Sequence, residues 1–259
     1  MFWWEADIDD CHSELMGVIH ELTDNHYDRM IANLEHLKVY SQRRYDLQDF
    51  KQGVVKTASY AMDKRDDMRM RLNVTQSMID TITSKIGKNR PRPMYLTEGG
   101  DYSLKNKAKM MGRMMEGLFM QTKMYDLMPK IFQDSCIFDL GVMKIYSEDE
   151  KIHVERVFAN EMLWDLDDAL YGDPQSLYQV KKVHKTYLLD RFSGFSTQIN
   201  NLGTENQQET PDSELIEVVE AWHLPTSPDS DDGRHVICVE GTTLLDEDYR
   251  RDKFPFLFL

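Results

Sequence analysis

The chain has 259 residues, of which 41% are hydrophobic and 29% are charged, a composition typical of a globular protein. Its formal net charge is −14, which argues against tight, static nucleic-acid binding, because Lys and Arg supply most of that affinity by neutralising phosphates. The first ten residues, MFWWEADIDD, lack the order of basic, apolar and small residues that marks a signal peptide.

The first predicted element is an amphipathic helix over residues 10–41. Its apolar face recurs every three or four residues and consists of Leu15, Val18, Leu22, His26, Met30, Leu34 and Leu37. Four histidines fall in this helix, but no two of them have the i, i+4 spacing of a metal-binding face. They are His12, His20, His26 and His36. We expect them to be ordinary helix residues.

A second helix is predicted for residues 74–87. Asn73 followed by Gln76 is a variant of the capping box that begins helices. The apolar side chains that follow recur every four residues along one stripe: Val74, Met78, Ile82 and Ile86. Gly87 is expected to end the helix in the left-handed conformation.

A stiff extended arm is predicted after this helix, where the sequence reads NRPRP. Pro91 and Pro93 fix their own backbone angles and remove two hydrogen-bond donors. They also push Arg90 and Arg92 toward extended geometry. We therefore expect a helix, a hard stop and an arm between residues 73 and 101.

A long helix is predicted for residues 103–139, with Asp101 or Ser103 as its N-cap. Pro129 is expected to kink or restart this helix, and Gly141 to mark its end. Seven methionines lie between residues 110 and 128: Met110, Met111, Met114, Met115, Met120, Met124 and Met128. We expect them to fill a core and a subunit contact, and a promiscuous binding surface is the alternative.

The basic residues of the chain are concentrated in its middle. Residues 64–130 contain 14 Lys and Arg against 7 Asp and Glu, whereas the remainder contains 17 against 38. The basic middle is expected to pair with the acidic remainder or with a neighbouring copy. Binding of another acidic partner is the alternative.

After Gly141 the sequence period changes to that of strands. The predicted strands are a hairpin at 142–147 and 151–157, then 177–184, 215–223 and 235–245. One or two helical turns are expected at 187–192, and exposed polar loops at 200–213 and 225–233. The fold class predicted from this order is α+β, with long amphipathic helices packed on one small mixed or antiparallel sheet.

The acidic segment DLDDALYGD, residues 165–173, raises the question of a metal site. It fails the calcium-loop template, since Leu170 occupies the position of the required glycine and Ser176 that of the final glutamate. A structural turn is expected instead. Trp164 should then be at least partly buried, while Asp165, Asp167 and Asp168 stay at the surface, because clustered carboxylates are costly to desolvate.

Motifs for catalysis, cofactors or metals are missing from the sequence. No GxSxG, P-loop or GxGxxG occurs, and Cys11, Cys136 and Cys238 are too far apart for a disulfide framework or a CxxC metal site. There is no run of 18 apolar residues that could span a bilayer. The sequence fits a reducing cytoplasm.

Four stretches of the sequence follow one another in an order that is typical of a known family. They are NVTQSMIDTITSKIGKNRPRP, YDLMPKIFQDSCIFDLGVMKIY, EKIHVERVFANEMLWDLDDALYGDPQSLYQVKKVHKTYLLDRF and KFPFLFL. The third is the most specific, because it passes from a strand through an Asp-rich turn and a Gly-Asp-Pro step to a basic strand and a short helix. Together they resemble the portal, or head-to-tail connector, family of tailed bacteriophages, particularly the podovirus type, over about residues 73–259.

This resemblance implies a structural subunit of a homo-oligomeric ring, typically of twelve copies, at one capsid vertex of the virion, assembled in the host cytoplasm. Double-stranded DNA would pass through the ring without sequence-specific binding during packaging and ejection. Terminase, capsid or scaffold protein and tail or adaptor proteins would dock on it. The resemblance implies no catalysis, cofactor, metal or membrane association, and it divides the chain into an N-terminal helical arm, 1–72, and an α+β wing-like domain, 73–259.

The resemblance also singles out structural and interface candidates: Arg90, Pro91, Arg92, Pro93, Gly141, Trp164, Asp165, Asp168, Gly172, Asp173, Pro174, Phe254, Pro255 and Phe256. Portal chains continue into a stem and a clip, so a fragment that stops within the wing is predicted. Its apolar residues 254–259 are expected to promote self-association, and ending the chain after Asp252 should give a more nearly monomeric wing.

Two other functions remain open. A capsid-associated scaffold or adaptor protein would share the helical arms and acidic loops but lack a compact α/β wing. A metal-dependent hydrolase would use Asp165, Asp167, Asp168 and Asp173, which requires several of these carboxylates about 2.0–2.6 Å from one ion.

Overall fold

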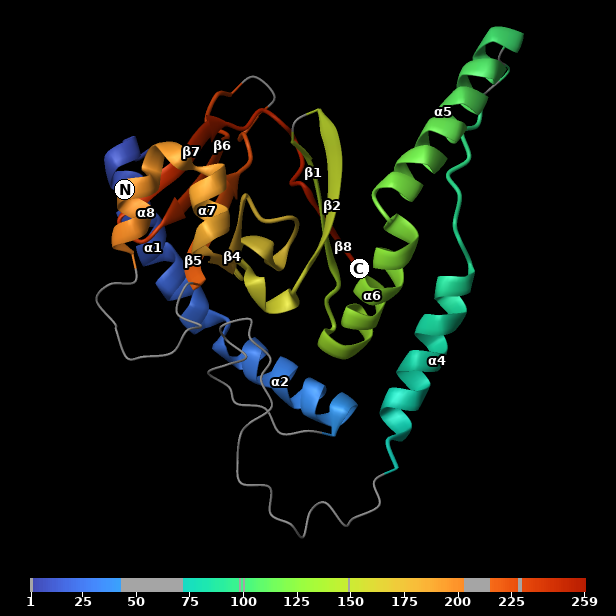
Figure 1. The fold of residues 1–259 in the computed structure, drawn as a ribbon, viewed down its shortest axis with the longest axis horizontal. Coiled ribbons are helices and arrows are strands. Elements are labelled where there is room, and N and C mark those ends of the chain that lie inside the picture. The colour runs from blue at the N-terminus through green and yellow to red at the C-terminus, as the bar shows by residue number, and fades with distance from the viewer. Residues whose placement is uncertain are drawn as a thin grey trace. The chain divides into compact units, whose positions relative to one another are not determined.

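The computed structural model describes residues 2–42, 72–97, 99, 101–148, 150–202, 215–227 and 230–259. The fold is α+β, and the chain divides into two compact units (Figure 1). The five-stranded unit contains the described residues of 1–34 and 160–254, and the three-stranded unit contains those of 35–43, 59–159 and 255–259. The described residues of the predicted N-terminal helical arm, 1–72, are thus divided between the two units. Most of the loop predicted at 200–213 lies outside the described residues.

The five-stranded unit is built on an antiparallel sheet of order β3-β4-β5-β6-β7. Its strands are β3 (Met162–Trp164), β4 (Ser176–His184), β5 (Leu215–His223), β6 (Arg234–Val239) and β7 (Thr242–Asp248). Alternate residues of a strand face opposite sides of a sheet. Val219 belongs to the core under α1 (Ile8–Asn25), and Val218 to the core under α7 (Lys185–Arg191) and α8 (Ser196–Asn201). Helices therefore cover both faces.

The single helix predicted for residues 10–41 is two helices, α1 and α2 (Tyr27–Ser41), which meet at His26. The predicted apolar face is largely confirmed, since Leu15, Leu22 and Met30 are buried. His26 is also buried, as its place in the stripe predicts, and it bonds the Trp164 carbonyl at the junction of the two helices. The spacing of the apolar residues continues unchanged across the break, so the periodicity of the sequence could not reveal it.

The three-stranded unit holds an antiparallel sheet of order β2-β1-β8. The strands are β1 (Val142–Glu148), β2 (Lys151–Val157) and β8 (Phe256–Phe258), and the helices are α4 (Val74–Lys88), α5 (Tyr102–Gln121) and α6 (Met124–Phe138). Ile131 of α6 packs on Met143 of β1 in a small core. The predicted hairpin is confirmed, but the one predicted sheet is two, because period shows where strands lie and not which strands pair.

The helix predicted for residues 103–139 is interrupted at Lys123, whose φ of 55° is left-handed, and not at Pro129. Pro129 lies inside α6 and faces α4, where a Cβ on Gly87 would come within 3.2 Å of its ring. Gly87 itself is helical, so it does not end α4 as predicted. It allows α4 and α6 to approach closely instead.

Gly141 follows the end of α6, as predicted, but for a different reason. The left-handed residue at that end is Asp139, with φ of 60°. A Cβ on Gly141 would lie 2.4 Å from the carbonyl oxygen of Ile131, closer than real Cβ atoms come. Gly141 is therefore required by close packing against α6.

The apolar segment Phe254, Pro255 and Phe256 leads into β8, which pairs with β1 of the same chain. Gly141 and Leu259 exchange two backbone hydrogen bonds of 3.0 and 2.8 Å. The segment thus has a partner within its own chain, although Leu257 to Leu259 remain partly exposed. Self-association through this end stays a prediction.

All three cysteines are free thiols. Cys11 on α1 and Cys238 on β6 are buried in the same core of the five-stranded unit, whereas Cys136 on α6 is exposed. Burial raises the pKa of Cys238 to about 12.

Candidate interaction surfaces

The acidic turn, residues 165–173, joins β3 to β4, and its carboxylates bond its own backbone. The amide of Asp167 donates to Asp165 Oδ1 at 2.9 Å, and the amide of Gln175 donates to Asp168 Oδ2 at 2.5 Å. Asp165, Asp167 and Asp168 are exposed and Trp164 is partly buried, which confirms the sequence-based prediction. Two carboxylates therefore fix the shape of the turn.

The remaining candidates of this turn are also at the surface. Gly172 and Asp173 are exposed, Pro174 is partly buried, and a Cβ on Gly172 would meet nothing within 4 Å. Among the described residues, no group of three or more His, Cys, Asp or Glu side chains is placed to hold a metal ion. The hydrolase alternative thus finds no ligand set in the described part of the chain.

A cluster that the sequence did not reveal supports the base of the acidic turn. The Arg29 guanidinium lies 4.4 Å from the centroid of the Trp164 ring, and its Nη2 donates to the Met162 carbonyl at 2.5 Å. His26 Nε2 lies 2.8 Å from the Trp164 carbonyl oxygen. Burial lowers the pKa of Arg29 to about 10. His26 appeared in the predicted apolar stripe, but Arg29 lies outside it, so no sequence signal linked the two to Trp164.

Acidification should weaken the five-stranded unit through His26. Burial lowers the pKa of His26, and Arg29 lowers it further, against the opposing effects of the hydrogen bond with the Trp164 backbone and of Asp165. Below its unfolded pKa of about 6.5, the unfolded chain then binds more protons, so the free energy of unfolding falls until the pH is below the folded pKa. Each unit of difference between the two pKa values contributes about 1.4 kcal/mol.

Urea unfolding between pH 7.5 and 5, followed by tryptophan fluorescence, measures this effect. All four tryptophans lie in the five-stranded unit, so the signal reports on that unit. His26→Gln retains a nitrogen near the Trp164 carbonyl but does not titrate, and it should reduce the pH dependence. Part of the pH dependence should remain in this variant, because burial also lowers the pKa of His223. An unchanged pH dependence in His26→Gln would contradict the assignment.

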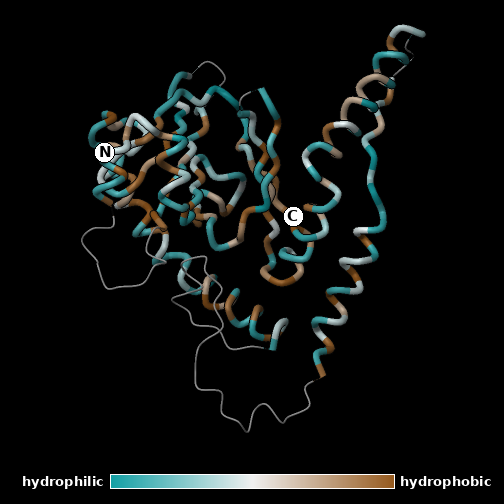
Figure 2. Tube along the Cα trace, viewed as in Figure 1, coloured by the Kyte–Doolittle hydropathy of each residue, from teal (hydrophilic) through white to brown (hydrophobic). Residues whose placement is uncertain are grey.

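Two helices of the three-stranded unit contain no buried residue. On α4 the stripe Val74, Met78, Ile82 and Ile86 is 40–62% exposed. Figure 2 shows hydrophobic residues recurring along this helix. On α5 the exposed apolar side chains include Met110, Met111, Met114 and Met120. Core filling within one chain is therefore wrong for these four methionines, whereas Met124 and Met128 do join the core. The subunit contact stays a prediction.

The segment between α4 and α5, residues 89–97, is the arm, and it contains neither helix nor strand. Asn89, which ends α4, is extended, and the extended geometry expected of Arg90 and Arg92 stays a prediction. Side chains of the long helical region hold it. Tyr125 donates to the Pro91 carbonyl at 3.3 Å, and Arg90 lies over the Tyr125 ring. Arg92 pairs with Glu116 at 3.4 Å. The two prolines thus lead the chain along α5.

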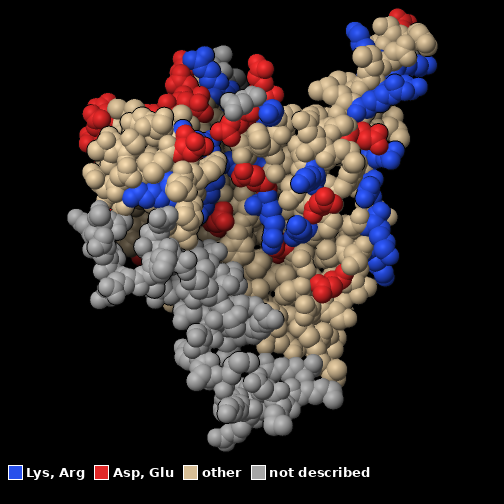
Figure 3. Space-filling view, in the orientation of Figure 1, with Lys and Arg blue, Asp and Glu red and all other residues tan. Residues whose placement is uncertain are grey.

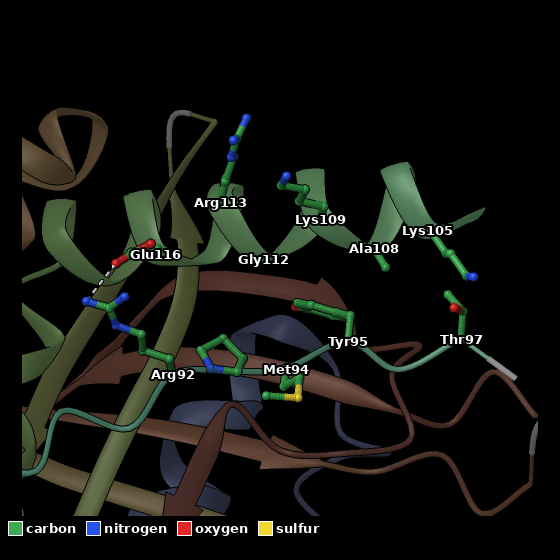
Figure 4. A pocket seen from close by; sticks show the side chains of 11 residues that line it. Arg92, Met94, Tyr95, Thr97, Lys105, Ala108, Lys109, Gly112, Arg113 and Glu116 are labelled. Carbon is green, nitrogen blue, oxygen red and sulfur yellow. Dashed lines mark ion pairs between the residues drawn. The ribbon is translucent and has the colours of Figure 1, made fainter. Parts of the chain in front are cut away.

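A groove of about 480 Å³ lies between the arm and α5, and its lining includes Pro93 (Figure 4). Four cations line it: Arg92, Lys105, Lys109 and Arg113. Lys105 reaches toward the arm, whereas Lys109 and Arg113 extend from α5 away from it (Figure 4). Figure 3 shows Lys and Arg side chains gathered over α5 and the arm. The groove is basic and open to solvent.

Comparison with protein-family models and with curated protein sequences finds no match to this chain. None of the described helices is long and apolar enough to cross a membrane.

Proposed function

We propose that this chain is a structural subunit of a bacteriophage portal ring at the capsid vertex. The observation that carries the proposal is the exposed apolar surface of α4 and α5 in the three-stranded unit. Apolar stripes at helical spacing are normally buried. Two long helices with no buried residue thus lack a cover in the described part of the chain, and identical neighbours in a ring would supply one.

The two sheets favour this proposal over the scaffold alternative. A scaffold or adaptor protein was expected to lack a compact α/β wing, whereas the described chain contains two compact units, each with an antiparallel sheet. The helix, arm and helix of residues 74–121 lie in the order that the resemblance to portal proteins requires. In the proposed ring, double-stranded DNA passes through the centre, and terminase, capsid or scaffold protein and tail or adaptor proteins dock on the outside.

The proposal predicts closed rings of this chain in solution. Sedimentation velocity and electron microscopy of the purified protein should show particles with rotational symmetry, at an integer multiple of 30.5 kDa. Ile82→Glu places a charge in the α4 stripe and should shift the particles to monomers, because a buried carboxylate is costly. Thr81→Glu, an exposed neighbour on another side of α4, is the matched control and should leave the rings intact. Monomers of the unaltered chain at all concentrations, or rings that tolerate Ile82→Glu, would contradict the proposal.

A further inference from the structure

The groove beside α5 combines a basic rim with a small, uncharged floor. Lys105, Lys109 and Arg113 are spaced by four residues along α5, at steps of about 6 Å, and all three line the groove. Lys105 reaches toward the arm, and the other two extend outward along the rim (Figure 4). Ala108 and Gly112, on the same helix, leave room between α5 and the Tyr95 ring of the arm. The one carboxylate among the described lining residues, Glu116, is paired with Arg92 at 3.4 Å. The groove therefore suits an acidic segment that also carries apolar side chains.

The acidic turn of residues 165–173 has these properties. It contains four aspartates and no Lys or Arg. Its apolar side chains also face solvent, since Tyr171 is 95% exposed and Leu170 is 66% exposed. Asp165 bonds the backbone within the turn and Asp168 that of Gln175 just after it, so the shape of the turn is set before any partner binds. A preformed segment loses less conformational entropy on binding than a flexible one.

We infer that the groove binds the acidic turn of a second copy of this chain. Charge complementarity is the main argument, because Lys105, Lys109 and Arg113 give the rim three cations beside the paired Arg92, and the turn carries four aspartates. Tyr171 and Leu170 of the turn would lie against the floor. A nucleic acid is the less suitable occupant, since the chain as a whole carries −14 and its residues outside 64–130 carry −21. The contact joins two different surfaces of the same chain.

Such a contact is heterologous: the groove of one copy holds the turn of the next, whose own groove is again available. Repeating it by a fixed rotation gives a closed ring when the rotation closes and a filament when it does not. The inference thus rests on the proposed function, to which it adds one defined contact between neighbours. It is independent of the apolar stripe on α4, whose variants test the ring itself.

A charge exchange tests the contact. Lys109→Glu in the groove and Asp167→Lys in the turn should each weaken self-association about tenfold or more in Kd, as measured by sedimentation velocity at physiological salt. Combined in one chain, the two substitutions again place opposite charges across the contact, and association should return. Lys107→Glu is the matched control, because Lys107 is exposed on the same helix but does not line the groove. Asp167 suits the exchange, since its backbone amide, which substitution retains, makes the bond to Asp165.

The outcomes separate this inference from the proposed function. Rings that form equally well with Lys109→Glu, Asp167→Lys and Lys107→Glu would overturn the inference and leave the proposed ring standing. Loss of association in both single variants without recovery in the combined chain would also overturn it. If Lys109→Glu reduced binding of a short double-stranded DNA and left self-association unchanged, the groove would be a nucleic-acid site and the inference wrong. Monomeric behaviour of every chain, unaltered protein included, would overturn both.

Discussion

Replacing Arg156 by methionine is expected to lower the free energy of unfolding of the three-stranded unit by about 3 kcal/mol, the low end for a buried carboxylate that loses its partner. Arg156 on β2 donates two hydrogen bonds to Asp134 on α6. Its Nη2 donates to Oδ1 at 2.5 Å, and its Nε donates to Oδ2. The Asp134 side chain is 3% exposed, whereas that of Arg156 is 42% exposed. Solvent screening of Arg156 places the expected effect at the lower end of the range.

The pH dependence of this variant has a defined sign. Burial raises the pKa of Asp134, and Arg156 opposes that rise. Without Arg156 the pKa of Asp134 should rise further, and protonation then removes the buried charge. A carboxyl group whose pKa is higher in the folded protein gains stability as the pH falls, so the deficit of Arg156→Met should shrink toward acidic pH.

Hydrogen exchange of α6 and β2 measures the loss of stability of the three-stranded unit. Tryptophan fluorescence would not report on this unit, because all four tryptophans lie in the other one. Lys151→Met, an exposed position on the same strand, is the control and should change stability by less than about 0.5 kcal/mol. Adding Asp134→Asn to Arg156→Met removes the charge and should recover part of the loss. A deficit below about 1 kcal/mol at neutral pH would show that Asp134 finds other partners.

Gly141→Ala is expected to destabilise the same unit by about 2–3 kcal/mol. The new Cβ would lie 2.4 Å from the Ile131 carbonyl oxygen, a backbone atom that cannot rotate away as a side chain could. Gly141 also exchanges two backbone hydrogen bonds with Leu259. Any shift of residue 141 that relieves the clash therefore disturbs the pairing of β1 with β8.

Gly117→Ala is the matched control for this substitution. Gly117 lies inside α5, and a Cβ there would meet nothing within 4 Å. Alanine favours the helix over glycine by about 1 kcal/mol, so this variant should be slightly more stable than the unaltered protein. Hydrogen exchange of β1 and β8 separates the two cases. Equal protection in Gly141→Ala and the unaltered chain would refute the close-packing argument.

The sequence predicted several elements well where the signal is local, although the one strand predicted at 235–245 is two strands, β6 and β7, joined by a turn at 240–241. The strand at 215–223 coincides with β5, and the hairpin at 142–157 with β1 and β2, because alternation is written in neighbouring residues. Strand partners depend on residues far apart, and β8 pairs with β1 across more than 100 residues. A single sheet was therefore predicted where the described residues form two. Likewise, Pro129 looked like the helix break, but the left-handed residue is Lys123, for which no sequence signal was visible.

The candidate surfaces were predicted in part. Desolvation cost correctly placed Trp164 in a partly buried site and Asp165, Asp167 and Asp168 at the surface. The arm was predicted from the geometry that proline imposes. The groove could not be predicted from the sequence, since it arises from the packing of the arm along α5. The exposure of the α4 stripe was also not predicted, because apolar spacing shows which side of a helix is apolar but not whether the rest of the chain covers that side.

The three thiols differ in their access to solvent, and this difference makes the unaltered chain suitable for site-specific labelling. Maleimides react with the accessible thiolate, so Cys136 on α6 should take the label while Cys11 and Cys238 stay protected inside the folded five-stranded unit. A fluorophore or spin label at Cys136 would mark each chain once. If the proposed ring forms, distances between labels would report its symmetry, and the rate at which Cys11 and Cys238 become reactive would report the opening of the five-stranded unit.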